Sequence, residues 1–208
     1  PLYLITMETS IIGLHLAGQS LMSITLQTYI VTNVPNNVWC AGEYHGGTAI
    51  TAWVGGSTGA YTRASKYDAD LLYHKGAKYD KLIVVWCHGE TDAETETGVK
   101  LYRERLEAYF NFLKLDLLTP NGEMFVVLGM PWDLDSNGYG EFNQAGRGDR
   151  IRTIIQGFAD RDPVHYATVE TKDGDRTGDV AKVHVSRADV LAITGPRFLA
   201  QVQTFINA

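Results

Sequence analysis

The stretch of sequence that decides the fold is LIVVWCHGETD, which runs from Leu82 to Asp92. Its first part, Leu82 to Cys87, is apolar without interruption, which is typical of a strand buried on both faces of a sheet. The second part, His88 to Asp92, brings a histidine and two carboxylates together directly after that strand. The sequence therefore predicts a buried strand that ends in a cluster of side chains able to do chemistry.

Similar apolar runs recur along the chain and alternate with longer helical patterns. The predicted strands are 11–17, 38–42, 82–87, 124–130 and 165–171, and the predicted helices are about 20–30, 63–75, 97–118, 150–159 and 187–206. Buried strands that alternate with amphipathic helices indicate a parallel sheet covered on both faces. We therefore expect an α/β fold, a three-layer α/β/α sandwich with a roughly five-stranded parallel sheet, in which residues 1–208 form a single domain.

Composition and charge exclude several classes of protein. The chain has 208 residues, of which 45% are hydrophobic and 20% charged, enough for one globular core. Its longest apolar run is far shorter than the about 20 residues that a membrane-spanning helix needs, so we expect no membrane partner. The formal net charge is −6, and no stretch concentrates lysine and arginine, so we also expect no nucleic-acid partner.

The two cysteines and the chain start complete this picture. Cys40 and Cys87 are too few for a disulfide framework and lack metal-ligand spacing, so we expect buried free thiols and no metal. The chain begins at Pro1 without a signal-peptide pattern. That start fits a domain excised from a longer protein, such as a secreted enzyme or a phage tail protein. The sequence gives no signal for an oligomeric state.

Sites in parallel sheets form at the carboxyl ends of strands, and the first strand ends in LAGQS, residues 16–20. A serine placed there, with its N–H at the start of a helix, suits acyl transfer because the helix dipole favours developing negative charge. The alternative is that Ser20 only caps the helix.

Three further segments follow the same rule. Gly46 and Gly47 follow the second strand and let a backbone N–H approach a ligand, although a plain turn is the alternative. His88 directly follows the third strand, and His184 precedes the last helix on DVAKVHVS, residues 179–186, where it is either a general base or structural. Together these segments offer a nucleophile, N–H donors and a base, which is what acyl transfer requires.

These segments resemble the sequence blocks of the SGNH (GDSL-like) hydrolase superfamily, in its carbohydrate-esterase branch of sialate O-acetylesterases and acetylxylan esterases. GQS at 18–20 is similar to the block G-Q-S-N-M, which carries the nucleophile. GGTAI at 46–50, with Trp53, is similar to G-G-T-x-I-x-x-W, whose glycine belongs to the oxyanion hole. WCHGETD at 86–92 resembles W-x-Q-G-E-x-D, and VHVS at 183–186 resembles D-x-V-H-L-S, which carries the base.

The resemblance implies a flavodoxin-like SGNH hydrolase fold and a serine esterase that removes O-acetyl groups from a carbohydrate through an acetyl-enzyme, without cofactor or metal. It implies Ser20 as nucleophile and His184 as base. It also implies an oxyanion hole formed by the N–H groups of Ser20 and of Gly46 or Gly47, with help from His88. We further expect substrate contacts from Trp53, Trp132 and Arg147.

Three positions depart from the family pattern. Leu21 replaces the asparagine after the nucleophile, and His88 replaces a glutamine expected to help the oxyanion hole. Ala181 stands where the acid of the triad is expected, three residues before His184. The candidates for that acid are Asp179, which we prefer, Asp175 and Asp173 on the same loop, and Glu90. A Ser–His dyad oriented by a backbone carbonyl is the remaining alternative.

Other functions compete with this interpretation. GGSTG at 55–59 matches the nucleophile pattern G-x-S-x-G, but an α/β-hydrolase needs more strands ahead of it, so we expect Ser57 to lie in a loop. A non-catalytic carbohydrate-binding domain is favoured by Ala181. A thioesterase or lipase of the same superfamily is a third alternative.

Overall fold

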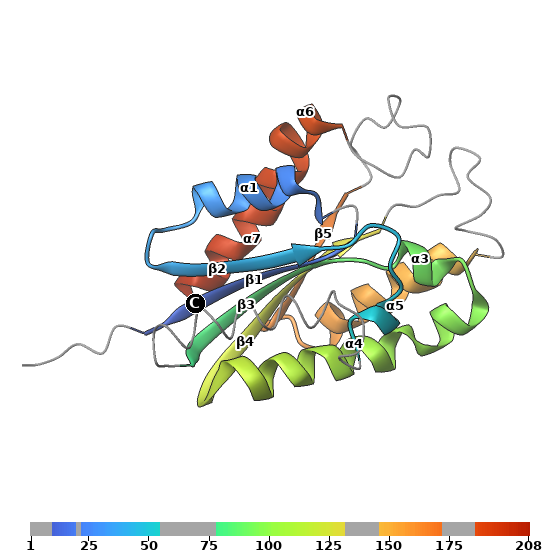
Figure 1. Ribbon diagram of the computed structural model, residues 1–208, viewed down its shortest axis with the longest axis horizontal. Coiled ribbons are helices and arrows are strands. Elements are labelled where there is room, and N and C mark those ends of the chain that lie inside the picture. The colour runs from blue at the N-terminus through green and yellow to red at the C-terminus, as the bar shows by residue number, and fades with distance from the viewer. Residues whose placement is uncertain (1–9, 20–21, 55–77, 132–145, 172–185) are drawn as a thin grey trace, which may run out of the picture.

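The computed structural model describes residues 10–19, 22–54, 78–131, 146–171 and 186–208 (Figure 1). Five strands form one sheet: β1 (Ile12–Gly18), β2 (Val38–Tyr44), β3 (Tyr79–Cys87), β4 (Leu118–Met130) and β5 (Tyr166–Glu170). Their order is β2-β1-β3-β4-β5, and every neighbouring pair is parallel. The predicted five-stranded parallel sheet is therefore confirmed.

Helices cover both faces of this sheet, as Figure 1 shows. One face carries α1 (Ile24–Asn33) and α7 (Gly195–Asn207), and the other carries α4 (Glu96–Leu117) and α5 (Arg147–Arg161). The shorter elements are the 3-10 turn η2 (Ile50–Ala52), α3 (Glu90–Ala93), α6 (Arg187–Asp189) and the π-helical turn η5 (Val190–Thr194). The predicted three-layer α/β/α sandwich is confirmed by this arrangement.

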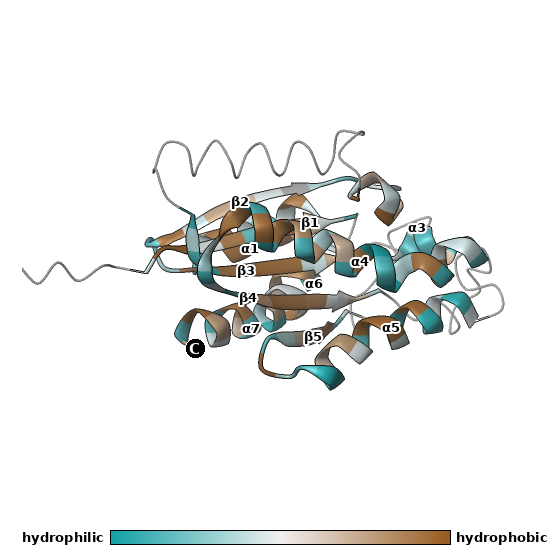
Figure 2. Cartoon of the chain, turned by 90° about the horizontal axis from the view of Figure 1, so that it is seen from below, coloured by the Kyte–Doolittle hydropathy of each residue, from teal (hydrophilic) through white to brown (hydrophobic). Residues whose placement is uncertain are grey.

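The alternating side chains of β3 show why its sequence is apolar throughout. Ile83 and Val85 belong to the core under α1 and α7, whereas Val84 and Trp86 belong to the core under α4 and α5. Because both faces of the strand are covered, neither set of positions tolerates a polar residue. Figure 2 shows the same pattern as hydrophobic colour concentrated on the central strands.

Helix α4 follows the sequence expectation closely. Thr95 caps its start by accepting a hydrogen bond from the backbone N–H of Gly98 at 2.9 Å. One stripe of the helix is buried against the sheet, and its members are Val99, Tyr102, Leu106, Tyr109, Phe110, Leu113 and Leu117. The helical spacing of apolar residues is therefore the feature that docks α4 on its face of the sheet.

The first helix differs from the prediction because it begins at Ile24 rather than at Ser20. Its N-cap is Ser23, whose hydroxyl accepts a hydrogen bond from the N–H of Leu26 at 3.4 Å. The cap of α1 is therefore Ser23, three residues later in the chain than the predicted start, and Ser20 itself lies outside the described residues.

Three further outcomes concern the helices and the thiols. The predicted last helix is divided by the turn η5 before α7 begins at Gly195. The predicted helix 63–75 lies outside the described residues. Both cysteines are free as expected, but Cys40 is only half-buried whereas Cys87 is fully buried. Among the described helices, none is both long and apolar enough to cross a membrane.

Candidate active site

The carboxyl ends of β2, β1 and β3 meet at one edge of the sheet, and hydrogen bonds join them beyond the last paired residues. The backbone N–H of Gln19 donates to the carbonyl of Cys87 at 2.8 Å, and the N–H of His45 donates to the carbonyl of Gly18 at 3.0 Å. The segment GQS therefore leaves the sheet between the segment HGG and the segment HGETD. Three of the four sequence blocks are brought together in this way.

Several predicted site residues cannot be placed by the structure. Ser20, His184, Asp179 and Trp132 lie outside the described residues, and so do Asp173, Asp175 and Ser57. Their roles remain predictions. The described part of the site consists of the residues that surround the end of β1.

Gly18 is required by the close approach of β1 to β3. Its φ is +152°, and a Cβ atom on this residue would overlap the carbonyl oxygen of Cys87. Gly89 is constrained in a similar way at the end of β3, because its φ is +130° and a Cβ would lie 2.7 Å from Cγ2 of Ile151. These two glycines allow the chain to turn out of the sheet while the strands stay in contact.

Gly46 and Gly47 form an exposed turn after β2. Gly47 has a φ of +67°, which favours glycine, whereas a Cβ added at either position would meet no atom of the described residues within 4 Å. Among the described residues, the space in front of both glycines is therefore open, which leaves room for a reacting group to approach their backbone. Their expected role in an oxyanion hole stays a prediction.

His88 is completely buried, and its ring stacks on Trp86 with the centroids 4.8 Å apart. Its Nδ1 lies 3.6 Å from Oδ2 of Asp92, and neither ring nitrogen has a hydrogen-bond partner among the described residues. Burial lowers its pKa to about 3, against a weaker opposing effect of the Thr48 backbone, so the ring is neutral near pH 7. This enclosure argues against its expected role as an oxyanion donor.

Asp92 links the segment after β3 to the segment after β2. Its Oδ2 accepts a hydrogen bond from the N–H of Ile50 at 2.8 Å, so the carboxylate fixes the turn that follows Gly46 and Gly47. Burial raises the pKa of Asp92 to about 6, and the hydrogen bond from Ile50 limits that rise. Asp92 is therefore a structural link and does not cap α3, whose N-cap is Gly89.

Glu90 is the second buried carboxylate at this edge, with 8% of its surface exposed. Neither of its carboxylate oxygens has a hydrogen-bond partner among the described residues. Burial raises the pKa of Glu90 to about 7, with a smaller contribution from the negative charge of Asp92. Carboxyl groups whose pKa is raised by burial are common in functional sites, and Glu90 lies where such sites form, at the end of a strand.

The expectation that Trp53 contacts the substrate does not agree with its position in the structure. Its side chain is fully buried and packs edge-on against Trp86 with ring centroids 5.2 Å apart. A ring with no exposed face cannot stack on a ligand, so Trp53 is a residue of the hydrophobic core. Arg147 lies at the start of α5 and donates from Nε to the carbonyl of Ala93 at 2.7 Å, which places it beside α3.

Gln19 is the site residue that sequence reasoning missed. Its side chain is 1% exposed and forms two hydrogen bonds to the segment after β3. Its Nε2 donates to the hydroxyl of Thr91 at 2.6 Å, and its Oε1 accepts from the N–H of Gly89 at 3.1 Å. The available signal was a long polar side chain between the strand-end glycine and the predicted nucleophile.

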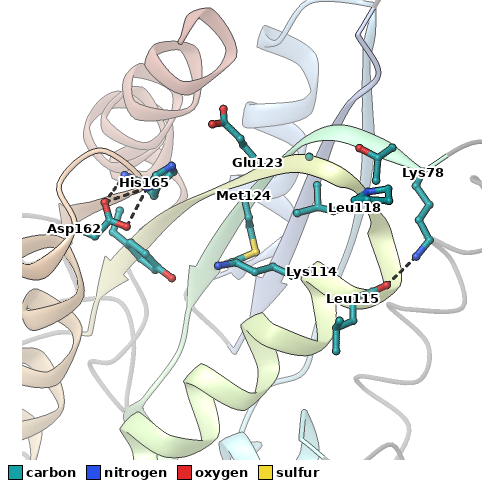
Figure 3. Close-up of a pocket in the computed structure, with 12 residues that line it drawn as sticks. Lys78, Lys114, Leu115, Leu118, Glu123, Met124, Asp162 and His165 are labelled. Carbon is teal, nitrogen blue, oxygen red and sulfur yellow. Dashed lines mark hydrogen bonds and ion pairs between the residues drawn. The ribbon is translucent and has the colours of Figure 1, made fainter.

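A separate cavity of about 700 Å³ lies at the opposite end of the sheet (Figure 3). It is lined by residues near the amino ends of β3, β4 and β5, among them Lys78, Leu118 and Tyr166. Its polar groups include Nδ1 of His165 and Oδ2 of Asp162, which lie within hydrogen-bond distance at 3.0 Å. This cavity is therefore distinct from the predicted site. Within the described ranges, no group of His, Cys, Asp and Glu residues could hold a metal ion.

Comparison with known proteins finds similarity in structure and not in sequence. No protein-family model matches the chain, and no curated protein matches it. A carbohydrate acetylesterase family member from Sinorhizobium meliloti matches with a TM-score of 0.65 at 14% identity, over 95% of this chain and 100% of that one. A protein from Arabidopsis thaliana matches with a TM-score of 0.68, also at 14% identity and with the same coverage.

A member of the lipolytic G-D-S-L family from Veillonella parvula has a TM-score of 0.56 at 11% identity, over 95% of this chain and 100% of that one. At such identities these matches establish the fold alone. The predicted flavodoxin-like SGNH hydrolase fold is therefore confirmed.

The buried carboxyl of Glu90 predicts a pH-dependent effect on stability. Its pKa is raised in the folded state, so the folded protein holds the proton more tightly, and stability falls as pH rises from about 4.5 to 7. Glu90→Gln cannot ionise. We expect this variant to gain up to about 3 kcal/mol in unfolding free energy relative to the wild type between pH 5 and pH 8.

Urea unfolding at both pH values measures this difference. His88 is present in both proteins, so its own titration cancels. The control is Glu104→Gln, because Glu104 is exposed on α4 and its substitution should change stability equally at both pH values. An equal effect of Glu90→Gln at pH 5 and pH 8 would refute the assignment.

Proposed function

We propose that this protein is a serine carboxylic-ester hydrolase that removes O-acetyl groups from a carbohydrate. The observation that carries the proposal is the convergence at one sheet edge, where Gln19 donates to Cys87 and Gly18 accepts from His45. Residue 20 follows directly from this junction. The shared fold with esterases of the GDSL type supports the proposal, because in open parallel sheets this edge is where ligands bind.

The proposed reaction proceeds in two steps. His184 removes the proton from Ser20 as the serine oxygen attacks the acetyl carbonyl, and the N–H groups of Ser20 and of Gly46 or Gly47 stabilise the oxyanion. The bond to the sugar oxygen then breaks, and the sugar leaves with the proton from His184. Water, activated by the same histidine, hydrolyses the acetyl-enzyme to acetate and free serine.

The open space at the HGG turn supports its proposed role as an oxyanion donor. A Cβ at Gly46 or Gly47 would touch nothing, so nothing among the described atoms blocks an acyl oxygen from their backbone. His88 is not part of the proposed oxyanion hole, because its ring is enclosed by the core.

Net charge limits the choice of carbohydrate. A chain of net charge −6 would bind an anionic polysaccharide only through local basic residues, and Arg147 and Arg150 both lie in the first turn of α5, where Arg147 contacts the carbonyl of Ala93 in α3. Arg150 already forms two hydrogen bonds with Glu96, at 2.7 and 2.6 Å. Because its guanidinium lies beside α3 at the carboxyl edge of the sheet, Arg147 is the residue we propose for contacting the substrate.

Substitution of the proposed nucleophile tests the proposal directly. We expect Ser20→Ala to abolish hydrolysis of a chromogenic acetyl ester, because removing the nucleophile removes most of the catalysis. The matched control is Ser23→Ala, which removes the cap of α1 and costs about 1 kcal/mol of stability while leaving turnover intact.

A fluorophosphonate probe followed by mass spectrometry provides a second measurement. We expect one adduct, on Ser20. An unlabelled but folded protein would favour the non-catalytic carbohydrate-binding domain, and labelling of Ser57 in place of Ser20 would overturn the proposed site.

Two substitutions decide which acid orients His184. Asp179→Asn and Glu90→Gln are compared by kcat, and we expect the variant that lacks the true acid to lose at least about tenfold. Asp179 is the preferred residue from the sequence, and the buried carboxyl of Glu90, which has no hydrogen-bond partner among the residues that the structure describes, supports the second candidate. If neither substitution reduces kcat, a Ser–His dyad gains support, with Asp173 and Asp175 as the remaining candidates for the acid.

Acetate release tests the substrate class. Acetylated xylan, O-acetylated sialic acid and O-acetylated bacterial polysaccharides are compared with nitrophenyl esters of acetate and palmitate. We expect at least one acetylated carbohydrate to be the best substrate. A preference for the palmitate ester would instead indicate a lipase or thioesterase.

A further inference from the structure

We propose that Gln19 is a positioning residue, which fixes the nucleophile relative to the segment that carries Glu90. The inference rests on the proposed function and adds to it a residue for which neither the sequence motifs nor the comparisons supply a role. It is carried by the hydrogen bonds of Gln19 and by its burial.

Gln19 is held by both its backbone and its side chain. Its N–H donates to the carbonyl of Cys87 at 2.8 Å, and its own carbonyl accepts from the N–H of Met22 at 2.9 Å. The side-chain amide adds the bonds to Gly89 and Thr91. The residue is therefore anchored at four points while only 1% of its surface is exposed.

Such an anchor has a direct consequence for the nucleophile. The carbonyl carbon of Gln19 is bonded to the nitrogen of Ser20, and the peptide unit between them is planar. Fixing the carbonyl of Gln19 therefore fixes the point from which Ser20 starts. Catalysis depends on such placement, since a displacement of about 1 Å can cost about a hundredfold in rate.

The two side-chain bonds also fix the segment on the other side of the site. They reach Gly89 and Thr91, the residues on either side of Glu90 in the chain. Because the N–H of Gly89 is already used by Gln19, it is not available to an oxyanion. Gln19 therefore couples the nucleophile to a candidate acid while it leaves the oxyanion role to the HGG turn.

The amide of Gln19 satisfies polar groups of the neighbouring segment, which an apolar side chain of similar length could not do. Without its Oε1, the buried N–H of Gly89 would lose this hydrogen-bond partner. A buried amide whose bonds are satisfied on a neighbouring segment selects one relative position of the two segments. This is the property that a positioning residue requires.

The experiment compares Gln19→Met, Thr91→Val and Thr91→Ser. Gln19→Met removes both side-chain hydrogen bonds and Thr91→Val removes the one to Thr91, each with little change in side-chain volume. Thr91→Ser keeps the hydroxyl. We expect Gln19→Met to lower kcat and the rate of fluorophosphonate labelling of Ser20 by about 10- to 100-fold, with KM changed less than about threefold. Thr91→Val should cause a smaller loss of the same kind, and Thr91→Ser should restore near-normal values.

The chain provides a matched control pair away from the site. The hydroxyl of Thr168 on β5 donates to Oε1 of Gln156 on α5 at 3.2 Å, and both side chains are half-buried. Gln156→Met and Thr168→Val remove the same chemical groups. We expect them to leave kcat and the labelling rate unchanged, even where they lower the melting temperature.

All rates are expressed per folded molecule, so that a loss of stability alone does not count as a loss of positioning. If the probe labels Ser20 in both Gln19→Met and Thr91→Val at the wild-type rate, and kcat is normal in both, the inference is overturned while the proposed function stands. Full turnover by Ser20→Ala would instead refute the proposed function. If Gln19→Met does not fold, Thr91→Val and its rescue by Thr91→Ser decide the question alone.

The double variant Gln19→Met/Thr91→Val provides a further criterion. If the two residues act through their shared hydrogen bond, the loss of kcat in the double variant should be close to that of Gln19→Met. It should be less than the product of the two single effects. Independent, multiplicative effects would contradict a shared positioning role.

Discussion

The close contact between the ends of β1 and β3 is the constraint on which the site depends. Gly18 lies against the carbonyl of Cys87, where no side chain fits, and the next residue donates its N–H to that same carbonyl. The strands therefore stay together to their last residue, and the chain turns away only after the contact is complete. The proposed nucleophile is the next residue in the chain, so this contact fixes the backbone that leads into it.

A buried polar cluster lies beside this contact, and its ionisable side chains lower the stability of the fold when they carry a charge. Ionising Glu90 and Asp92 is disfavoured by burial, and so is protonating His88. Lowering the pH therefore removes the unfavourable charge of the two carboxylates, but it also favours protonation of the histidine, which burial opposes. A core made only of apolar residues would avoid these costs. The cluster lies at the carboxyl edge of the sheet, where sites form. This location favours a functional reason for keeping these destabilising groups.

The sequence was most informative where one pattern had one physical cause. Continuous apolar strands require cover on both faces, which predicted the sheet and its layers. Trp53 and the first helix illustrate the opposite case. A tryptophan beside a glycine motif can face either the core or a ligand, and Ser20 and Ser23 are both able to cap a helix. The structure places Trp53 in the core and makes Ser23 the cap.

By itself, the sequence determined the parallel sheet, the order of its motifs and the edge at which they meet, because periodicity and chain order follow from local chemistry. The tertiary structure alone decided which polar residues touch. Gln19 and Thr91 are 72 positions apart, and Asp92 and Ile50 are 42 apart. These contacts exist because parallel strands bring distant segments to one edge, a relation that local spacing along the chain does not encode.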